Sequence, residues 1–452
     1  MIEYFYIIKS ELKYFITIFI ELFIIFSVIN PNNIIKADNI KKNFIQKKIE
    51  INNIENKVLI NNGWFKVNRK TIFKENTYKI GSRSRFLKVN NGGFIVVTQK
   101  EVESLPKNTP AHVGKYKLSI NKIKEGKIEW NKIYGYKGMN RNNCTEIKST
   151  NDNGYIMIGE CSEGYTWDDL HKLLVVKLDR LGRVEWEKIW GPENGERSSL
   201  WGVNVMEIEE GYIVIGTNTW GSMYSKDKNH FYIIKLDKNG NEKWRKDLER
   251  FRDYQYVYRG FKYRENEIAI IMEKLENKLT YVIMESKLGK IKEEIEYKIN
   301  ENYKGLAFYE SDMIKLDDNN RIIVGELKDE DLNKIGIYIM DVNNEIFRQF
   351  RVYWNDNNKA RYIGKAKFNN GNYILYGELN YKNNYDNSKI FIMKFNKSNE
   401  VNYIKIFSID VIDQIRGLEI NDKRELIGLF EWSTIENGKY NSYISIEKIT
   451  VK

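Results

Sequence analysis

The chain has 452 residues, a formal net charge of +11 at pH 7, two cysteines, three histidines and only four prolines. It can bury a large core, and short alternating runs rich in isoleucine and tyrosine favour β-strands. Lysine recurs along the whole sequence without a compact basic cluster, so we expect no nucleic-acid partner. The sequence lacks CxxC, HExxH, GxSxG, P-loop and GxGxxG motifs, so we predict no metal site, no cofactor and no catalytic residue.

Residues 1–37 are predicted to be a signal peptide or a membrane anchor built on a hydrophobic helix. Residues 14–29 are apolar except for Thr17, Glu21 and Ser27. This run is long for a signal-peptide core and short for a spanning helix of about 20 residues. Both interpretations place the rest of the chain outside the cytoplasmic membrane, either anchored to it or secreted. A buried core helix is the remaining alternative.

The polar residues 38–62 are interpreted as a spacer, and residues 63–452 as a domain of repeated units. Each unit begins with a strand, a tight turn and a second strand that ends in glycine. Five units carry this marker glycine, at Gly159, Gly216, Gly325, Gly377 and Gly428. A degenerate unit fills the interval between residues 216 and 325, and a further unit opens the array at residues 86–99.

The second half of each unit is a hairpin, clearest in residues 171–191 (HKLLVVKLDRLGRVEWEKIWG). An apolar strand leads to a turn at Gly182, where glycine can adopt positive φ, and an alternating strand follows. Related hairpins occur at residues 115–135 and 230–248. The five marked units, the degenerate unit and the opening unit make seven units of four strands. We therefore predict an all-β fold, a seven-bladed β-propeller of four-stranded antiparallel blades, preceded by the N-terminal hydrophobic helix.

Ring closure can be predicted from the two ends of the repeat region. The last unit stops after its third strand, at residues 443–452. A strand pattern at residues 61–73 supplies the missing fourth strand, because Gly63 takes the place of the turn glycine in the other hairpins. We predict that this strand pairs with the bare edge of the last blade, and the alternative is an extra inner strand of the first blade. Deleting residues 1–73 should then destabilise the domain, whereas deleting 1–55 should not.

These repeats resemble the propeller repeats of secreted and surface-exposed bacterial proteins. The resemblance is carried by NDNGYIMIG (151–159) with VVKLDRLGRVEWEKIWG (175–191), and by EEGYIVIG (209–216) with YIIKLDKNGNEKW (232–244). It implies blades like those of quinoproteins and Kelch proteins, in a fold that hosts enzymes, lectins and interaction scaffolds. The cofactor and metal residues of quinone-dependent dehydrogenases have no recognisable counterpart, so that activity is not carried over.

Histidines and acidic residues offer two further candidate sites. His112, His171 and His230 lie near the entries of third strands, and a metal site would need all three to converge. The acidic stretches 168–169 and 329–331 occupy equivalent loops and suit Ca²⁺ binding or acid–base chemistry. The alternatives are polar residues at strand entries and solvated loop charges, and we adopt these.

The long connections, from second to third strand and from blade to blade, open on one face of the predicted ring, here the long-loop face. Binding residues usually lie on long loops, and aromatic rings with a polar end suit stacking on sugars or gripping peptides. The candidate ligand-binding residues are Tyr165, Trp167, Trp220, Tyr224, Tyr381, Tyr385, Trp432 and Tyr440. We predict a binding or interaction module for a glycan or a protein ligand. The alternatives are an enzyme acting on an envelope polymer or carbohydrate, and a purely structural surface protein whose rings cap the blades.

Cys144 and Cys161 flank the first hairpin of the second unit. A two-residue loop at Asp152 and Asn153 would place the two cysteines directly opposite on adjacent strands, at a spacing that a disulfide can bridge. A turn built on Asn153 and Gly154 would leave the sulfur atoms diagonal and too far apart. An extracytoplasmic location permits oxidation, so we predict a disulfide, with two reduced thiols as the alternative.

Overall fold

The computed structural model divides the chain into two compact units, Met1–Ile45 and Gln46–Lys452. The predicted signal or anchor segment 1–37 lies outside the described residues, and within the described ranges no helix is long and apolar enough to cross a membrane. The structure describes residues 45–51, 53–59, 67–77, 84–89, 92–103, 114–165, 170–191, 198–220, 230–248, 254–274, 278–299, 306–315, 321–329, 334–341, 346–353, 358–367, 372–381, 389–399, 401–408, 413–421, 423, 425–436 and 439–451.

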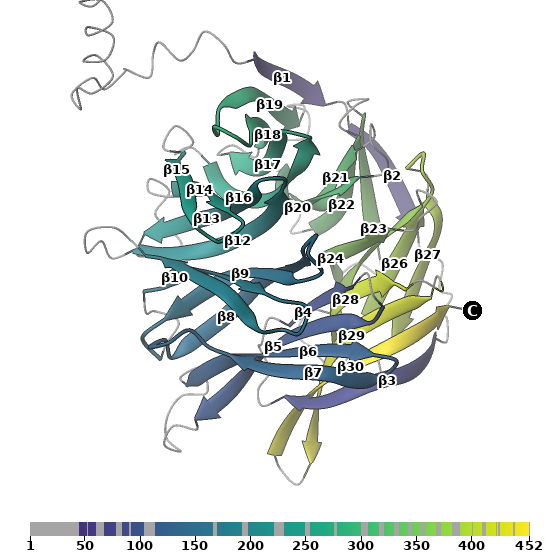
Figure 1. Ribbon diagram of the computed structural model, residues 1–452. Helices are drawn as coiled ribbons and strands as arrows, with labels where there is room; N and C mark the ends of the chain where they lie inside the picture. Colours follow the sequence, from purple (N-terminus) through teal and green to yellow (C-terminus); the bar gives the residue numbers. More distant parts are fainter. Residues whose placement is uncertain are drawn as a thin grey trace, which may run out of the picture. The chain divides into compact units, whose positions relative to one another are not determined.

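The described strands form seven sheets, numbered here 1 to 7 in chain order (Figure 1). Sheet 1 contains β4 (Arg85–Lys88), β5 (Phe94–Glu103), β6 (Lys115–Lys124) and β7 (Lys127–Tyr134). Sheet 2 contains β8 (Arg141–Ser149), β9 (Tyr155–Ser162), β10 (Lys172–Leu178) and β11 (Val184–Trp190). Sheet 3 contains β12 (Ser198–Ile208), β13 (Gly211–Trp220), β14 (His230–Asp237) and β15 (Glu242–Asp247).

Sheets 4 and 5 each carry a fifth strand from the N-terminal segment. Sheet 4 contains β16 (Tyr254–Arg264), β17 (Glu267–Lys274), β18 (Lys278–Glu285), β19 (Ile291–Ile299) and β1 (Ile45–Ile51). Sheet 5 contains β20 (Leu306–Lys315), β21 (Arg321–Asp329), β22 (Lys334–Asp341), β23 (Ile346–Tyr353) and β2 (Asn53–Leu59).

Sheets 6 and 7 complete the array. Sheet 6 contains β24 (Asn358–Lys367), β25 (Tyr373–Tyr381), β26 (Lys389–Phe395) and β27 (Val401–Ser408). Sheet 7 contains β28 (Asp413–Ile420), β29 (Leu426–Glu436), β30 (Lys439–Val451) and β3 (Val67–Thr77). The prediction of an all-β fold with four-stranded antiparallel sheets is confirmed for the described residues of sheets 1, 2, 3, 6 and 7, whereas sheets 4 and 5 gain a fifth strand. Such sheets are consistent with β-propeller blades.

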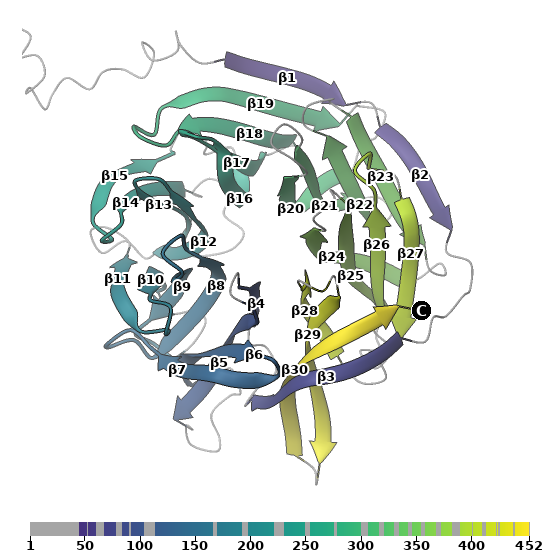
Figure 2. The ribbon, with the colours of Figure 1, turned by 45° about the vertical axis from the view of Figure 1, so that its right-hand side comes forward.

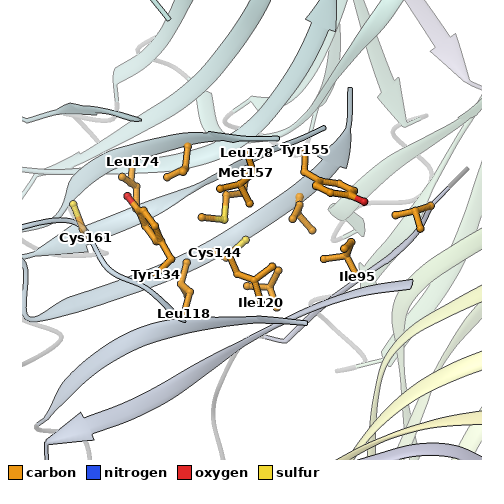
Figure 3. Packing of buried hydrophobic residues seen from close by; sticks show 14 residues of the cluster. Ile95, Leu118, Ile120, Tyr134, Cys144, Tyr155, Met157, Cys161, Leu174 and Leu178 are labelled. Atoms are coloured by element: carbon orange, nitrogen blue, oxygen red, sulfur yellow. The ribbon is translucent and has the colours of Figure 1, made fainter. Parts of the chain in front are cut away.

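Within the unit Gln46–Lys452, each sheet packs against the next one in the chain, and sheet 7 packs against sheet 1 through β28 and β4. The first strand of each sheet faces a common centre (Figure 2). Buried apolar clusters fill the interfaces: one joins sheets 1 and 2 around Ile120 and Leu174 (Figure 3), and another joins sheets 7 and 1 around Leu429 and Val96. Each fully buried aliphatic side chain contributes about 1.5–3 kcal/mol, so these interfaces are the main source of stability.

The marker glycines lie where the first strand of a sheet bulges toward the second. In β8 the register shifts between Cys144 and Glu146, opposite Gly159, and a Cβ atom on Gly159 would lie 1.9 Å from the carbonyl oxygen of Asn143. Similar bulges lie opposite Gly216 in sheet 3 and Gly377 in sheet 6. Glycine recurs there because the bulged backbone leaves no room for a side chain. In sheet 7 the bulge lies opposite Phe430 and not opposite the predicted marker Gly428.

The aspartate of the hairpin motif holds the turn between third and fourth strands. Oδ1 of Asp179 accepts hydrogen bonds from the backbone N–H groups of Leu181 and Arg183, at 2.8 and 2.9 Å. Asp237 makes the same pair of hydrogen bonds in sheet 3. The carboxylate accepts hydrogen bonds from backbone N–H groups of the turn that have no partner on the neighbouring strand. This explains why aspartate recurs at the end of the third strand.

The tryptophan of one hairpin packs on the turn glycine of the next. A Cβ atom on Gly240 (φ 78°) would lie 2.7 Å from the Trp186 ring, and Trp186 Nε1 donates a hydrogen bond to the carbonyl of Lys238 at 2.9 Å. The contact recurs between Trp244 and Gly289, again with a donated hydrogen bond from the indole, and between Trp130 and Gly182. The two residue types of the repeat motif therefore meet across neighbouring sheets.

The lysine of the same motif is buried and paired. Nζ of Lys177, whose side chain is 1% exposed, lies 2.7 Å from Asp152 Oδ2 and 2.9 Å from Glu185 Oε2. Lys235 pairs with Glu210 in sheet 3 in the same way. Although partial burial raises the pKa of Asp152, hydrogen bonds from Lys177, Thr150 and the Gly154 backbone outweigh it and lower this pKa to about 2. These lysines are structural cations, because each buried ammonium group has a carboxylate partner.

The N-terminal strand closes the array as predicted. β3 pairs antiparallel with β30, with Arg69 opposite Ile449, so the last sheet takes its outer strand from the start of the chain. The alternative, an extra inner strand of the first sheet, is wrong. The strand runs over Val67–Thr77, later than the predicted 61–73.

The interpretation of residues 38–62 as a spacer is wrong for residues 45–51 and 53–59, which form strands. This polar stretch contains β2, which pairs in parallel with β23 over seven positions from Asn53 to Leu59, and β1, which lies at the edge of sheet 4. The outer strand β23 (IFRQFRVY) is rich in aromatic and β-branched residues and would otherwise present an unpaired edge. Polar composition obscured these strands because an edge strand needs backbone pairing more than an apolar face.

We predict that replacing Gly240 by alanine lowers stability more than replacing Gly138 by alanine. Both glycines have positive φ, 78° and 82°, but a Cβ on Gly138 meets no atom within 4 Å. Backbone strain of about 1–2 kcal/mol applies to both, whereas displacement of Trp186 adds about 1–3 kcal/mol to the first alone. Chemical denaturation of both variants measures the difference. Equal losses would show that the tryptophan–glycine contact contributes nothing.

We also predict that a chain lacking residues 1–59 is less stable than one lacking residues 1–44. The first truncation removes β1 and β2, whereas the second keeps every described strand. The lost ladder hydrogen bonds contribute about 1 kcal/mol net each. This reverses the expectation that deleting residues 1–55 is harmless. Melting temperatures of the two proteins decide the matter, and identical values would contradict a stabilising role for β1 and β2.

Candidate functional site

Of the predicted ligand-binding aromatics, Tyr165 is the one whose side chain the structure describes. Trp167, Tyr224 and Tyr385 lie outside the described residues. The remaining four were predicted on long loops, but they lie in strands: Trp220 in β13, Tyr381 in β25, Trp432 in β29 and Tyr440 in β30. Their placement on loops is wrong because the strands continue into the connections, and their role in ligand binding stays a prediction. In sheet 7, β29 and β30 stay paired as far as Glu436 opposite Lys439, so that a long hairpin replaces the expected loop.

The histidine and acidic candidates are only partly described. His171 is buried and its ring stacks on Trp201 at a centroid distance of 4.3 Å, between sheets 2 and 3. His230 lies in β14, whereas His112, residues 168–169 and residues 330–331 lie outside the described part. Among the described residues no group of three or more His, Cys, Asp or Glu side chains could hold a metal ion.

Tyr165 lies at the junction of sheets 1 and 2, at the end where the long loops leave the strands. Its ring is partly exposed, and its carbonyl accepts hydrogen bonds from the backbone N–H of Gly114 at 3.3 Å and from Arg141 Nη1 at 2.9 Å. Lys115 Nζ lies 6.0 Å from the centre of the Tyr165 ring, and the Arg141 guanidinium lies over Tyr116 at 5.1 Å. We call Lys115, Tyr116, Arg141 and Tyr165 the junction site.

The junction site is held in place by backbone hydrogen bonds across the two sheets. The backbone N–H of Tyr116 donates to the carbonyl of Asn140 at 2.7 Å, and that of Asn140 donates to the carbonyl of Ser162 at 2.9 Å. Glu103 pairs with Lys115 at 2.5 Å, and an exposed Val102 precedes it in β5. An aromatic ring beside a cation on a rigid base can stack on a flat, polar-edged group such as a sugar or a peptide side chain.

The predicted disulfide is wrong, because Cys144 and Cys161 are both free and buried. The turn between β8 and β9 has three residues, 151–153, with Asn153 at φ 64°, and the bulge shifts the register once more. Cys144 therefore faces Gly159, and Cys161 faces Asn142. Both thiols line one core cluster (Figure 3), where burial raises the pKa of each to about 12. Buried thiols of this kind are unreactive.

A polar cluster on the innermost strands is absent from the sequence predictions. Glu146 Oε1 lies 2.5 Å from Arg259 Nη1, and Glu146 Oε2 accepts a hydrogen bond from Asn204 Nδ2 at 2.6 Å. Lys148 Nζ lies 3.2 Å from the same carboxylate and donates to the carbonyl of Val205 at 2.7 Å. These contacts link β8, β12 and β16, the first strands of sheets 2, 3 and 4.

The cluster continues through sheets 7 and 1. Arg416 lies 2.7 Å from Glu431 Oε2 through both Nε and Nη2, and the Ser84 hydroxyl donates to Glu431 Oε1. Arg85 then donates to the carbonyl of Thr145 in β8. We call Arg85, Glu146, Lys148, Arg259, Arg416 and Glu431 the axial cluster. Sequence reasoning missed it because the residues next to the bulges, such as Glu146 and Arg259, differ from repeat to repeat, so no motif marks them.

Glu419, also on β28, differs from the other acidic residues in the described part of the chain whose pKa is shifted. Burial raises its pKa to about 7, and the nearby positive charge of Lys88 opposes this only in part. Lys88 itself donates to the carbonyl of Ile420 at 2.9 Å. A carboxyl group that titrates near neutral pH can exchange protons under physiological conditions.

We predict that Glu419 makes the protein less stable as the pH rises from about 4.5 to 7. The folded pKa is above the unfolded one, so the protonated native state is favoured below pH 4.5 and the advantage disappears through pH 7. Glu419→Gln should remove this pH dependence of the free energy of unfolding between pH 4.5 and 7. The size of the effect follows from the raised pKa of Glu419 and is a few kcal/mol at most. Denaturation from pH 4.5 to 8 measures it. Glu425→Gln is the control, because a hydrogen bond from Lys448 lowers the pKa of Glu425. A stability curve for E419Q that runs parallel to the wild-type curve would contradict the assignment.

No protein-family model matches the sequence, and no curated protein matches it. Among solved structures, the chain is similar to a member of the DUF4221 family from Bacteroides vulgatus, with 11% identity, coverage of 86% of this chain and 100% of that one, and a TM-score of 0.37. A puromycin hydrolase is 8% identical over 77% of this chain and 50% of its own, with a TM-score of 0.47. A subtype N10 neuraminidase-like protein of A/little yellow-shouldered bat is 9% identical over 84% of this chain and 100% of its own, with a TM-score of 0.36. Likenesses at this level assign neither a function nor a ligand.

Proposed function

We propose that the unit Gln46–Lys452 is a seven-bladed β-propeller that binds a glycan or protein ligand at its long-loop face, outside the cytoplasmic membrane. Seven sheets in the described residues, each packed on the next and the seventh on the first, support the ring. The apolar residues 14–29 support export or anchoring. The proposal makes the chain a binding module, held at the membrane or released from it.

The observation that carries the binding function is the junction site. Tyr165 presents a partly exposed ring while its own carbonyl is fixed by Gly114 and Arg141, so little conformational entropy is lost when a ligand docks. Lys115 adds a cation beside the ring. Rigid aromatic residues with adjacent polar groups are the usual anchors of glycan and protein interfaces.

An enzyme acting on an envelope polymer or carbohydrate is the second candidate function. One observation favours it, the carboxyl group of Glu419 with its pKa of about 7, which suits proton transfer near neutral pH. Binding has the stronger support, because the two carboxylates of the axial cluster are each paired with arginine and are poorly placed to act as acid and base.

We predict that Tyr165→Ala reduces binding to the glycans that the wild-type protein captures on a glycan array by roughly tenfold or more, the effect of losing about 1.4 kcal/mol or more of stacking. Lys115→Ala should also weaken binding to these glycans, but by a smaller factor than Tyr165→Ala. The measurement is array intensity followed by titration calorimetry with the best oligosaccharide.

Leu288→Ala serves as the matched control, because Leu288 is an exposed apolar residue, 63% exposed, at the turn between third and fourth strands of sheet 4. It should leave glycan binding unchanged. If Y165A folds normally and binds as tightly as the wild type, the junction site is not the ligand site.

A further inference from the structure

Two sheets of the protein show that the outer edge of a sheet can take an added strand. β1 extends sheet 4 beyond β19, and β2 pairs in parallel with β23 over seven positions in sheet 5 (Figure 2). β19 has three glutamates and two lysines, whereas β1 has two lysines and one glutamate, so their net charges are opposite. An outer edge therefore accepts an extended segment, and in sheet 4 that segment has complementary charge.

β7 is the outer edge strand of sheet 1, and no strand in the described part of the chain pairs with its outer side. It exposes two large apolar side chains, Ile128 at 47% and Ile133 at 44%. Of the edge strands of sheets 2 and 3, β11 exposes one such residue, Val184, and β15 exposes none. Because edge strands usually avoid exposed apolar residues, the two isoleucines indicate a surface that another chain covers.

Ile128 and Ile133 lie on the same side of sheet 1. Ile128 is paired with Ile123 and Ile133 with Ser119, and these two residues of β6 are four positions apart. Because side chains alternate along a strand, residues four positions apart share a face. Ile123 belongs to the cluster that joins sheets 7 and 1, so both exposed isoleucines lie on the side of sheet 1 that faces sheet 7.

The two lysines of β7 lie on the opposite side. Lys132 is paired with Ile120, which belongs to the cluster that joins sheets 1 and 2. Lys127 is paired with Lys124, four positions after Ile120 in β6. The edge therefore has apolar groups on one side and positive charges on the other, a pattern that a strand of alternating residue types complements.

Most of the charges on and beside β7 are already paired, but those of its two lysines are not. Glu129 is paired with Lys122 at 3.2 Å, whereas Lys127 and Lys132 take part in no ion pair within the described part of the chain. The turn before β7 adds one lysine and one glutamate, whose charges cancel.

The outer strand of sheet 2, β11, presents one acidic residue to this side. Glu187 lies opposite Val176, a member of the cluster between sheets 1 and 2, and accepts a hydrogen bond from the Tyr134 hydroxyl at 2.8 Å. Glu185 is paired with Lys177 instead. Two lysines against one hydrogen-bonded glutamate leave a net positive charge, which favours acidic side chains in an added strand.

We propose that β7 binds an extended peptide segment of a protein partner, in which apolar and acidic residues alternate, as a fifth strand of sheet 1. The apolar side chains of the segment cover Ile128 and Ile133, and its acidic side chains pair with Lys127 and Lys132. Main-chain hydrogen bonds supply affinity, and the alternation supplies specificity, because successive side chains of a strand point to opposite faces. This surface is separate from the junction site and does not depend on ligand binding there.

The test uses the full-length protein and a fluorescein-labelled peptide of four Glu-Val repeats as the probe. The fluorescence anisotropy of this peptide should rise to saturation as the protein is added. A peptide of Glu-Pro repeats has the same charge but cannot donate ladder hydrogen bonds, and a peptide of Lys-Val repeats has the opposite charge. Both control peptides should bind at least about tenfold more weakly.

A charge reversal on β7 should reverse this preference. The double variant K127E/K132E should bind the Lys-Val peptide more tightly than the Glu-Val peptide. K188E is the matched control, because Lys188 is a lysine of the edge strand β11 that lies opposite Val175, a member of the cluster between sheets 2 and 3. K188E should keep the wild-type preference, and so should Y165A, in which the junction site is altered.

A second readout needs no variant. In hydrogen-exchange mass spectrometry of the wild-type protein, saturating Glu-Val peptide should slow the exchange of amides in residues 127–134. The amides of residues 184–190, in the edge strand of sheet 2, should exchange at the same rate with and without the peptide.

The proposal is overturned if the Glu-Val peptide does not bind saturably, if the Glu-Pro peptide binds as tightly, or if residues 127–134 exchange at the same rate with and without the Glu-Val peptide. If raising the concentration of the protein alone slows exchange there, a second copy occupies the edge and the proposal is wrong. If K127E/K132E does not fold, the exchange experiment on the wild-type protein decides alone.

Discussion

The pairing of β3 with β30 is the constraint on which the rest of the fold depends. Each sheet has an apolar face that only the next sheet covers, so an open row would leave two faces in water. The cluster that joins sheets 7 and 1 buries those faces against each other. The long-range pairing brings the N-terminal segment against the last strand of the chain and gives sheet 7 its outer strand. The N-terminal strands β1 and β2 extend the same principle by covering the edges of sheets 4 and 5.

Contacts between neighbouring sheets explain why the repeat motif contains the residues it does. The tryptophan of one unit rests on the turn glycine of the next, the aspartate holds that turn, and the lysine is a buried cation with its own carboxylate. None of these residues needs a ligand to account for it. The pattern that recurs from unit to unit is therefore structural, and functional residues must be sought where the repeats differ from one another.

The residues that differ between repeats gather in two places. At the junction of sheets 1 and 2, Tyr165 and Lys115 form an exposed aromatic and cationic surface. On the innermost strands, the position directly after the bulge carries Glu146, Asn204 or Arg259, depending on the sheet. A repeated scaffold keeps its backbone rigid with the shared residues and leaves equivalent positions free to vary, which suits a binding protein.

Sequence periodicity by itself determined the all-β class, the four-stranded unit, the tight turns and the closure by an N-terminal strand, because these depend on local alternation and turn chemistry. Tertiary structure decided everything that depends on register. One extra residue in the β8–β9 turn and one bulge separated Cys144 from Cys161. Strand pairing turned the polar stretch around Asn53–Leu59 into a sheet edge, because ladder hydrogen bonds leave no hydrophobic signature. The axial cluster joins Glu146 to Arg259, 113 residues away, and only the packing of three sheets brings such distant residues together.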